Sequence, residues 1–485
     1  MNYKMVLSVL GKAMIIEATL LLVPLLVGVY FGESYYLSFL IPMAGLFAVG
    51  LPLSLIMPRD KAIYAKEGFV IVALCWVVLS LVGCLPFIIS GEIKGFADAF
   101  FETVSGFTTT GASVLDSVEG MSKSVMFWRI LTHWLGGMGV LVFILAVLPT
   151  AGAGLMYVFR AESPGPSSGK LVGKMRHTAQ ILYGIYVIMT FAEAVLLFIG
   201  GMSLYDSVLT AFSTAGTGGF GIHDGSIAYY NNVYFEMVVA VFMFLFGINF
   251  NIFYLILTGN VLKALKSEEL IVYVVMIVTA SLVIAINILG TVDNFWQAMR
   301  YSFFQVNTVS STTGFSTADF AGDEWPALSK GILLFLTVIG ASGGSTGGGM
   351  KVARMCILAR SAQANVRRMS YPRAVVPVKF EGKTVSHETE RGVLTYFILY
   401  IAIACVCTLL LSLLNAFADV FDNFSATLAC ISNVGPGVTK AIGPMASYSQ
   451  YSPVSKIILS FVMLAGRLEI FPMLILLVPR TWKKG

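Results

Sequence analysis

Thr108-Thr109-Thr110-Gly111 is the first of four similar loops in this chain, and the other three are Gly216-Thr217-Gly218-Gly219, Ser311-Thr312-Thr313-Gly314 and Ser432-Asn433-Val434-Gly435. Each loop follows a segment too short to cross a bilayer and precedes a hydrophobic stretch long enough to do so. Such a loop exposes backbone carbonyls, which can replace the water shell of a metal cation. The glycine that ends each loop can adopt backbone angles that turn carbonyls inward. Four such loops in one polypeptide predict a complete pore.

The composition indicates a polytopic membrane protein. Of the 485 residues, 57% are hydrophobic and only 12% are charged, and the mean hydropathy is +0.84. Soluble globular proteins of this size carry about twice that share of charge. Hydrophobic runs long enough to span a bilayer lie near residues 13–31, 36–57, 69–90, 125–148, 179–202, 233–258, 270–290, 329–358, 392–415 and 454–479, which predicts ten crossings.

The order of these runs predicts an internal repeat. After the first two runs, the chain resolves into four units of roughly 100 residues, each made of an outer helix, a short helix, a loop and an inner helix. The predicted parts are two N-terminal transmembrane helices (1–66) and four pore repeats (67–150, 151–262, 263–385 and 386–485). The expected fold is therefore an all-α membrane protein with pseudo-four-fold symmetry and two extra N-terminal helices.

An aspartate lies thirteen residues before three of the four loop glycines. These residues, Asp98, Asp206 and Asp422, are predicted to cap the short helices, and the third unit has Tyr301 there, with Asp293 as its candidate cap. A capped helix aimed into the membrane directs its negative dipole end toward the centre, which favours cations. The alternative is four re-entrant hairpins that only pack together.

These loops, their order and their spacing resemble the TrkH/KtrB/HKT superfamily of potassium transporters, over residues from about 67 to 482, and the two extra helices are most similar to the TrkH branch. The resemblance implies potassium uptake, which rubidium also follows, across a bacterial inner membrane and without a cofactor. It also implies a homodimer that docks a cytosolic nucleotide-binding ring of the TrkA type. The implied potassium-binding filter comprises Thr109, Thr110, Gly111, Thr217, Gly218, Gly219, Thr312, Thr313, Gly314, Asn433, Val434 and Gly435.

The third inner helix is interrupted by a run from Gly340 to Gly349 that contains six glycines and cannot hold a helix in lipid. We expect this run to line a cavity below the filter, and the resemblance implies that it obstructs the pore. The candidate gate residues are Gly340, Gly343, Gly344, Ser345, Gly347, Gly348, Gly349, Lys351 and Arg467, and Lys351 is expected to cap the break or to face the pathway. The alternative for the run is a flexible kink that permits close helix packing.

Arg467 lies near the middle of the last hydrophobic span. A charge at this depth is costly unless it faces water or a partner, so it is a functional candidate. A pore-facing arginine below the filter would repel cations, and the resemblance implies the same barrier. A structural pair with Glu469 is disfavoured because residues two apart on a helix do not face each other. Pairing with Glu193 or Glu236 is also possible.

Basic residues gather in alternate connections, notably 150–177 and 351–391, while the other connections lean acidic. By the positive-inside rule, the basic connections and both termini are predicted to be cytoplasmic. The basic segments also suit anionic lipid headgroups. Nothing in the sequence indicates binding to nucleic acid, and the six cysteines and four histidines show no metal-ligand spacing.

Two other functions are consistent with parts of the sequence. An ion-coupled symporter using protons or sodium is one, although four repeats that run in the same direction favour a channel-like path over inverted repeats. The other is an intramembrane serine hydrolase, since Gly340-Ala341-Ser342-Gly343-Gly344 matches a nucleophile motif. Ser342 would then need a histidine base, for which His133 is the candidate near membrane depth. We expect a transporter and not an enzyme.

Overall fold

The computed structural model describes residues 1–56, 65–139, 175–415 and 417–482. The helices are α1 (Tyr3–Leu20), α2 (Leu22–Phe31), α3 (Tyr36–Ser54), α4 (Ala65–Gly83), α5 (Leu85–Ser90), α6 (Phe96–Phe107), α7 (Lys123–Gly137), α10 (Met175–Ile199), α11 (Leu204–Gly216), α12 (Val233–Phe246), α13 (Phe250–Leu257), α14 (Val261–Leu265), α15 (Glu268–Asn287), α16 (Phe295–Ser310), α17 (Ala327–Ile339), α18 (Val352–Ser370), α19 (His387–Leu414), α20 (Val420–Ile431), α21 (Pro453–Arg467) and α22 (Phe471–Leu477), with short 3-10 turns η1 (Ser226–Tyr230) and η2 (Pro479–Trp482). The strands β1 (Lys379–Phe380) and β2 (Lys383–Thr384) pair antiparallel as a small hairpin.

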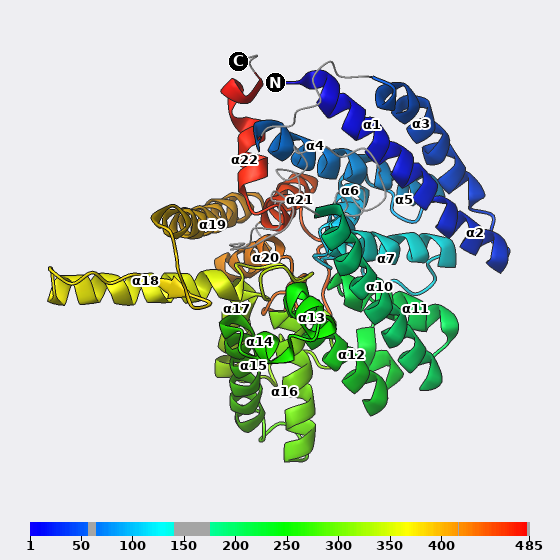
Figure 1. Cartoon of the computed structure of the whole chain (residues 1–485). Coiled ribbons are helices and arrows are strands. Elements are labelled where there is room, and N and C mark those ends of the chain that lie inside the picture. The colour runs from blue at the N-terminus through cyan, green and yellow to red at the C-terminus, as the bar shows by residue number, and fades with distance from the viewer. Residues whose placement is uncertain (57–64, 140–174, 416, 483–485) are drawn as a thin grey trace.

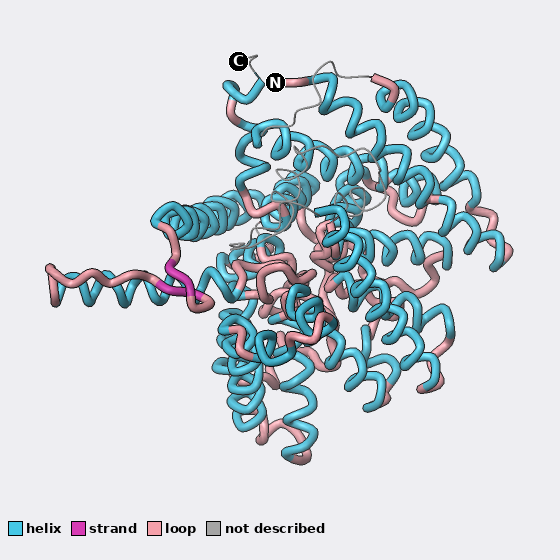
Figure 2. The backbone as a smooth tube through the Cα atoms, in the orientation of Figure 1, coloured by secondary structure: helices cyan, strands magenta, loops and turns pink. Residues whose placement is uncertain are grey.

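The helices surround a central region of loops, as the pink segments in Figure 2 show. Helix α18 projects away from this body together with the β1–β2 hairpin (Figure 1). The N-terminal helix α1 and the last described turn, η2, lie side by side, since the Tyr3 hydroxyl donates to the Trp482 carbonyl. The chain therefore has the predicted all-α polytopic fold: outer helices, short helices that end in central loops, and inner helices, preceded by the N-terminal helices α1 to α3.

Hydropathy predicted ten crossings, with an interruption only in the run 329–358, and several of these runs are not continuous helices in the structure. Among the described residues, six helices are long and apolar enough to span a membrane, or seven if the bent pair α12–α13 counts as one span. Helices α12 and α13 meet at 89°, α17 ends at Ile339, and α21 ends at Arg467. Helix α7 ends at Gly137, and most of the remaining predicted run lies outside the described residues.

Only the break in the third inner helix was expected, so the breaks after α12 and α21 correct the prediction. Hydropathy averages composition over a window and is blind to a local change of backbone direction. After α21, Glu469 and Ile470 have φ values of 58° and 67°, which end the helix although the surrounding residues remain apolar. The exact repeat boundaries remain a prediction.

The short helices are α6, α11, α16 and α20. The N-cap positions are Gly95, Ser203, Asn294 and Asp419. Three predicted caps are therefore wrong by three residues, and the candidate in the third unit, Asp293, is wrong by one. Asp98, Asp206 and Asp422 instead lie in the first turn of their helices. In α20 the side chains of Asp419 and Asp422 form a capping box. An acidic residue in the first turn still stabilises the positive end of α6, α11 and α20, whereas α16 has none there. All four helices end directly before the central loops.

Candidate functional site

The four central loops, 108–111, 216–219, 311–314 and 432–435, share one backbone conformation. The terminal glycines have φ values of 77°, 77°, 91° and 93°, in chain order. The residues two positions earlier, Thr109, Thr217, Thr312 and Asn433, also have positive φ values, of 54°, 53°, 61° and 55°. Non-glycine residues rarely adopt this conformation, and such strain gathers at functional sites. Its recurrence at one position in every loop shows that the four loops are built alike.

The loops close into a ring in which each glycine faces the carbonyl oxygen of the next loop. A Cβ added to Gly111 would lie 2.0 Å from the Gly218 oxygen, and one added to Gly219 would lie 2.1 Å from the Thr313 oxygen. The corresponding distances are 2.5 Å from Gly314 to the Val434 oxygen and 2.5 Å from Gly435 to the Thr110 oxygen. The contacts therefore run from the first loop to the fourth and return to the first. We name this arrangement the central ring.

Side-chain hydrogen bonds join the loops of the central ring to one another and to neighbouring helices. The Asn433 amide donates to the Thr110 hydroxyl at 2.9 Å and to the Met463 carbonyl at 3.0 Å, which joins the fourth loop to the first. The Tyr400 and Ser432 hydroxyls lie 2.6 Å apart and connect α19 to the fourth loop. The loop residues from Thr108 to Thr110, Thr217, Ser311 to Thr313 and Ser432 to Val434 are all buried.

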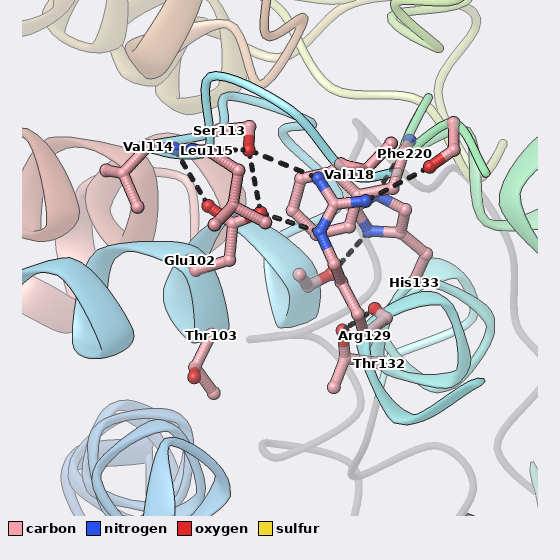
Figure 3. Close-up of polar contacts among 12 residues, drawn as sticks. Glu102, Thr103, Ser113, Val114, Leu115, Val118, Arg129, Thr132, His133 and Phe220 are labelled. Atoms are coloured by element: carbon pink, nitrogen blue, oxygen red, sulfur yellow. Dashed lines mark hydrogen bonds and ion pairs between the residues drawn. The ribbon is translucent and has the colours of Figure 1, made fainter. Parts of the chain in front are cut away.

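A buried ion pair supports the first and second loops (Figure 3). The Arg129 guanidinium on α7 lies 2.7 Å from the Glu102 carboxylate on α6, and both side chains are almost fully buried. Glu102 also accepts from the Val114 amide at 2.9 Å. Arg129 donates to the Gly221 carbonyl at 3.2 Å and lies over the Phe220 ring, 3.6 Å from its centroid. The pair therefore connects the segments that leave the first two loops.

His133 completes this support. Its Nδ1 lies 2.8 Å from the Gly106 carbonyl oxygen, so Nδ1 carries the proton and donates, and its Nε2 accepts from the Phe220 amide at 3.2 Å. A Cβ on Gly218 would lie 2.2 Å from the imidazole. Both imidazole nitrogens of His133 thus bind backbone groups beside the central ring, which argues against His133 as a base for Ser342.

A vestibule of about 650 Å³ opens on one side of the ring, and its lining includes all four terminal glycines, Gly111, Gly219, Gly314 and Gly435. Asp116 lies at this vestibule, where hydrogen bonds from Ser447 and Ser449 hold the pKa of the Asp116 carboxyl below its usual value. The carboxylate therefore stays ionised well below neutral pH and gives the vestibule fixed negative charge.

The glycine-rich loop, residues 340–349, lies against the other side of the ring. The Gly348 amide donates to the Thr312 hydroxyl at 2.6 Å. A Cβ on Gly347 would lie 2.6 Å from the Ser311 oxygen, and one on Gly348 would lie 2.3 Å from the Ser432 oxygen. The missing side chains therefore allow this loop to contact the third and fourth central loops. The run therefore lies next to the ring, while its lining of a cavity and its obstruction of the pore remain predictions.

Internal contacts fix the shape of the glycine-rich loop. The φ values of Gly340, Gly344 and Gly349 are 70°, 73° and 75°, which other residues adopt only with strain. The Ser345 hydroxyl donates to the Ser342 carbonyl at 2.6 Å. The Lys351 ammonium donates to the Gly347 carbonyl. Lys351 therefore caps the break, which is the first of the two expectations for this residue.

A second set of contacts attaches the loop to neighbouring helices. The Glu269 carboxylate at the start of α15 accepts from the Gly343 amide at 2.6 Å and from the Asn249 amide at 3.3 Å. The Phe250 amide donates to the Gly344 carbonyl at 3.1 Å. Asn249 is thus an interhelical hydrogen-bond partner.

Arg467 lies beside the glycine-rich loop. Its guanidinium donates to the Thr346 carbonyl at 2.7 Å, and to the Gly136 and Gly137 carbonyls at 2.6 Å and 2.7 Å. The last two belong to the C-terminal end of α7, where a cation interacts favourably with the helix dipole. Glu469 pairs instead with Arg354, at 2.5 Å, and Glu236 pairs with Arg300, at 3.1 Å.

Sequence reasoning missed Glu102, Arg129 and Glu269, and it considered His133 only as a candidate base for Ser342 and not as a support of the central ring. The available signal was a charged residue inside or beside an apolar run, which is costly unless it is paired. Arg129 meets this criterion as clearly as Arg467 does. Within the described residues, no group of three or more His, Cys, Asp or Glu side chains is arranged to hold a metal ion.

Comparisons with known proteins agree with this architecture. The family model TrkH, described as cation transport protein, matches residues 42–484. The Trk system potassium uptake protein TrkH of Escherichia coli K12 is 32% identical, and that of Vibrio parahaemolyticus is 33% identical, each over 100% of both chains. The crystal structure of the potassium transporter TrkH from Vibrio parahaemolyticus superposes with a TM-score of 0.89 at 30% identity, covering 100% of both chains. The chain is therefore a multi-pass membrane protein that belongs to the TrkH family of cation transport proteins.

Proposed function

We propose that the protein takes up potassium ions across a bacterial inner membrane through a channel-like pore whose selectivity filter is the central ring. The observation that carries this proposal is the closed sequence of glycine-to-carbonyl contacts around the four loops. Carbonyl oxygens held at a ring by strained backbone can replace the hydration shell of a cation. The C-terminal ends of the four short helices add negative potential at the same place. Relatives named as potassium uptake proteins favour potassium as the ion.

The glycine-rich loop and Arg467 serve as the gate in this proposal. The loop contacts the side of the ring opposite the vestibule, through Gly347 and Gly348, and therefore stands where an ion would leave the filter. The Arg467 guanidinium binds the Thr346 carbonyl of this loop. Its fixed positive charge opposes cation passage, and opening requires both the loop and this charge to move from the pathway.

A contact path from the basic segment 351–391 to the gate supports control by a cytosolic partner. The Glu381 carboxylate in the β1–β2 hairpin accepts from the Ser267 hydroxyl at 2.7 Å and from the Glu269 amide at 3.0 Å. The Glu269 side chain in turn binds the Gly343 amide of the glycine-rich loop. We infer that a nucleotide-binding ring of the TrkA type, docked on a homodimer with cytoplasmic termini, acts on the gate through this path.

Rubidium flux into proteoliposomes that carry only this chain tests the function. Uptake that potassium blocks, and that sodium blocks less, is the expected result. Deletion of residues 343–348 should raise that uptake, because it removes the obstruction without changing the central ring. If neither the wild type nor the deletion variant carries rubidium, the pore proposal is wrong.

The same vesicles distinguish a pore from an ion-coupled symporter. A pore follows the potassium gradient and the membrane potential alone. A symporter would stop when the proton or sodium gradient is collapsed at constant potential. The direct line from vestibule to ring to glycine-rich loop favours the pore.

A further inference from the structure

The four positions two residues before the ring glycines share a backbone conformation but bind different partners. The Asn433 amide binds the first loop and Met463. The Thr217 hydroxyl donates to the Gly216 carbonyl in its own loop, at 2.6 Å, and the Thr109 hydroxyl is buried without a hydrogen-bond partner. Only Thr312, among these four, binds the glycine-rich loop, by accepting from the Gly348 amide at 2.6 Å.

The Gly348–Thr312 hydrogen bond lies where the glycine-rich loop packs closely against both the third and the fourth central loops. Neither Gly347 nor Gly348 can carry a Cβ without striking the Ser311 or Ser432 carbonyl. Thr312 is fully buried while the loop is docked, so water cannot replace the bond in the closed state. An amide left without an acceptor in such a place loses more than the hydrogen bond itself.

We propose that Thr312 latches the glycine-rich loop to the filter, so that gate closure and cation binding at the inner end of the ring use the same hydroxyl oxygen. The proposal rests on the proposed function and assigns Thr312 a role that Thr109 and Thr217 lack. A hydroxyl oxygen that accepts an amide hydrogen faces a partial positive charge. A cation at the same oxygen opposes that contact, and by linkage each therefore weakens the other.

Valine and serine substitutions at the three threonines test the latch. Valine has nearly the same shape as threonine but no hydroxyl. Thr312→Val should raise basal rubidium flux by at least about fivefold, which is the equilibrium shift that corresponds to the loss of one neutral hydrogen bond. Thr109→Val and Thr217→Val also remove a ring hydroxyl but release no gate contact, so they should not raise flux. Thr312→Ser keeps the hydroxyl and should restore flux to within about twofold of the wild type.

Deletion of residues 343–348 provides the background for a double-mutant cycle. Without the loop, Thr312→Val should no longer raise flux, because the contact that it breaks is already absent. If Thr312→Val and Thr217→Val change flux equally in the full-length chain, or if Thr312→Ser behaves like Thr312→Val, the latch is wrong while the pore stands. If no variant carries rubidium with or without the loop, the proposed function fails and the latch fails with it.

The linkage to ions has its own readout. The rate at which a thiol reagent modifies Ser345→Cys, corrected for the parent protein's own cysteines, reports how often the loop opens. This rate should rise with rubidium concentration when Thr312 is present. It should be high and independent of rubidium in Thr312→Val, and a rubidium dependence that survives the substitution contradicts competition at this oxygen.

Discussion

Alanine at a ring glycine perturbs the central ring in a way whose size follows from the structure. A Cβ on Gly219 would lie 2.1 Å from the Thr313 carbonyl oxygen, whereas Cβ atoms in proteins essentially never approach within 3.0 Å. The carbonyl must therefore move by about 1 Å, away from the place where it would face an ion. Misplacement by about 1 Å costs on the order of a hundredfold in a preorganised site. We expect Gly219→Ala to lose selective rubidium flux by that factor.

The four positions should not respond equally. The distances are 2.0 Å at Gly111 and 2.1 Å at Gly219, but 2.5 Å at Gly314 and at Gly435. The second pair requires a displacement of about half that size, and we expect a loss of roughly tenfold for it. A four-fold symmetric filter would give four equal losses, so this ordering is specific to the asymmetry of the ring.

Gly91→Ala is the matched control, because Gly91 has a φ of 78° and nothing within 4 Å of an added Cβ. It carries the same backbone strain, about 1–2 kcal/mol, without any clash at the ring. The assay is rubidium flux into proteoliposomes, with potassium and sodium as competitors and with flux normalised to folded protein. Equal losses at all four ring positions, or a loss at Gly91 as large as at Gly219, would refute the reasoning.

Further predictions concern the gate, the support of the ring and the vestibule. Arg467→Ala should raise basal rubidium flux. Arg467→Lys should raise it less, because lysine keeps the charge but cannot bind all three carbonyls as arginine does. Unchanged flux in both variants would contradict the proposed barrier. Glu269→Ala should raise basal flux, since a buried amide left unpaired costs about 1–3 kcal/mol, and Glu269→Gln, which keeps a carbonyl acceptor, is the control. Arg129→Met should lower the free energy of unfolding by about 3–5 kcal/mol, measured by thermal denaturation in detergent, and adding Glu102→Leu should recover much of it. Asp116→Asn should slow uptake at low ionic strength and much less at high salt. Because the pKa of Asp116 is lowered, the wild type should keep this contribution even near about pH 4, where an ordinary aspartate is half protonated.

The architecture could be predicted because its signals are local and repeated. The glycines at 111, 219, 314 and 435 stand in the same relation to a short helix and a long apolar run, and each must reach a conformation that favours glycine. The six glycines between Gly340 and Gly349 exclude a helix for the same reason. These features place the ring and the glycine-rich loop without any knowledge of long-range contacts.

The supporting contacts could not be predicted because they join residues that are far apart in the chain. Arg129 and Arg467 look alike in sequence, yet one pairs with a carboxylate and the other binds carbonyls. The helix caps were misplaced because an aspartate stabilises either the cap or the first turn, and the alignment of the loops does not distinguish these positions. Glu269 resembled an ordinary first-turn acid until its contact with Gly343 was seen.

The closure of the ring has a consequence for biosynthesis. The Asn433 amide binds the Thr110 hydroxyl across 323 residues of chain. The first loop therefore cannot form its contact with the fourth loop until most of the protein has been synthesised. At elongation rates of about 5–20 residues per second, this interval lasts roughly 15–65 s. Throughout that time the strained first loop lacks the contact that completes it. The nascent chain therefore holds an unfinished pore in the membrane and becomes able to select ions only after its C-terminal repeat is inserted.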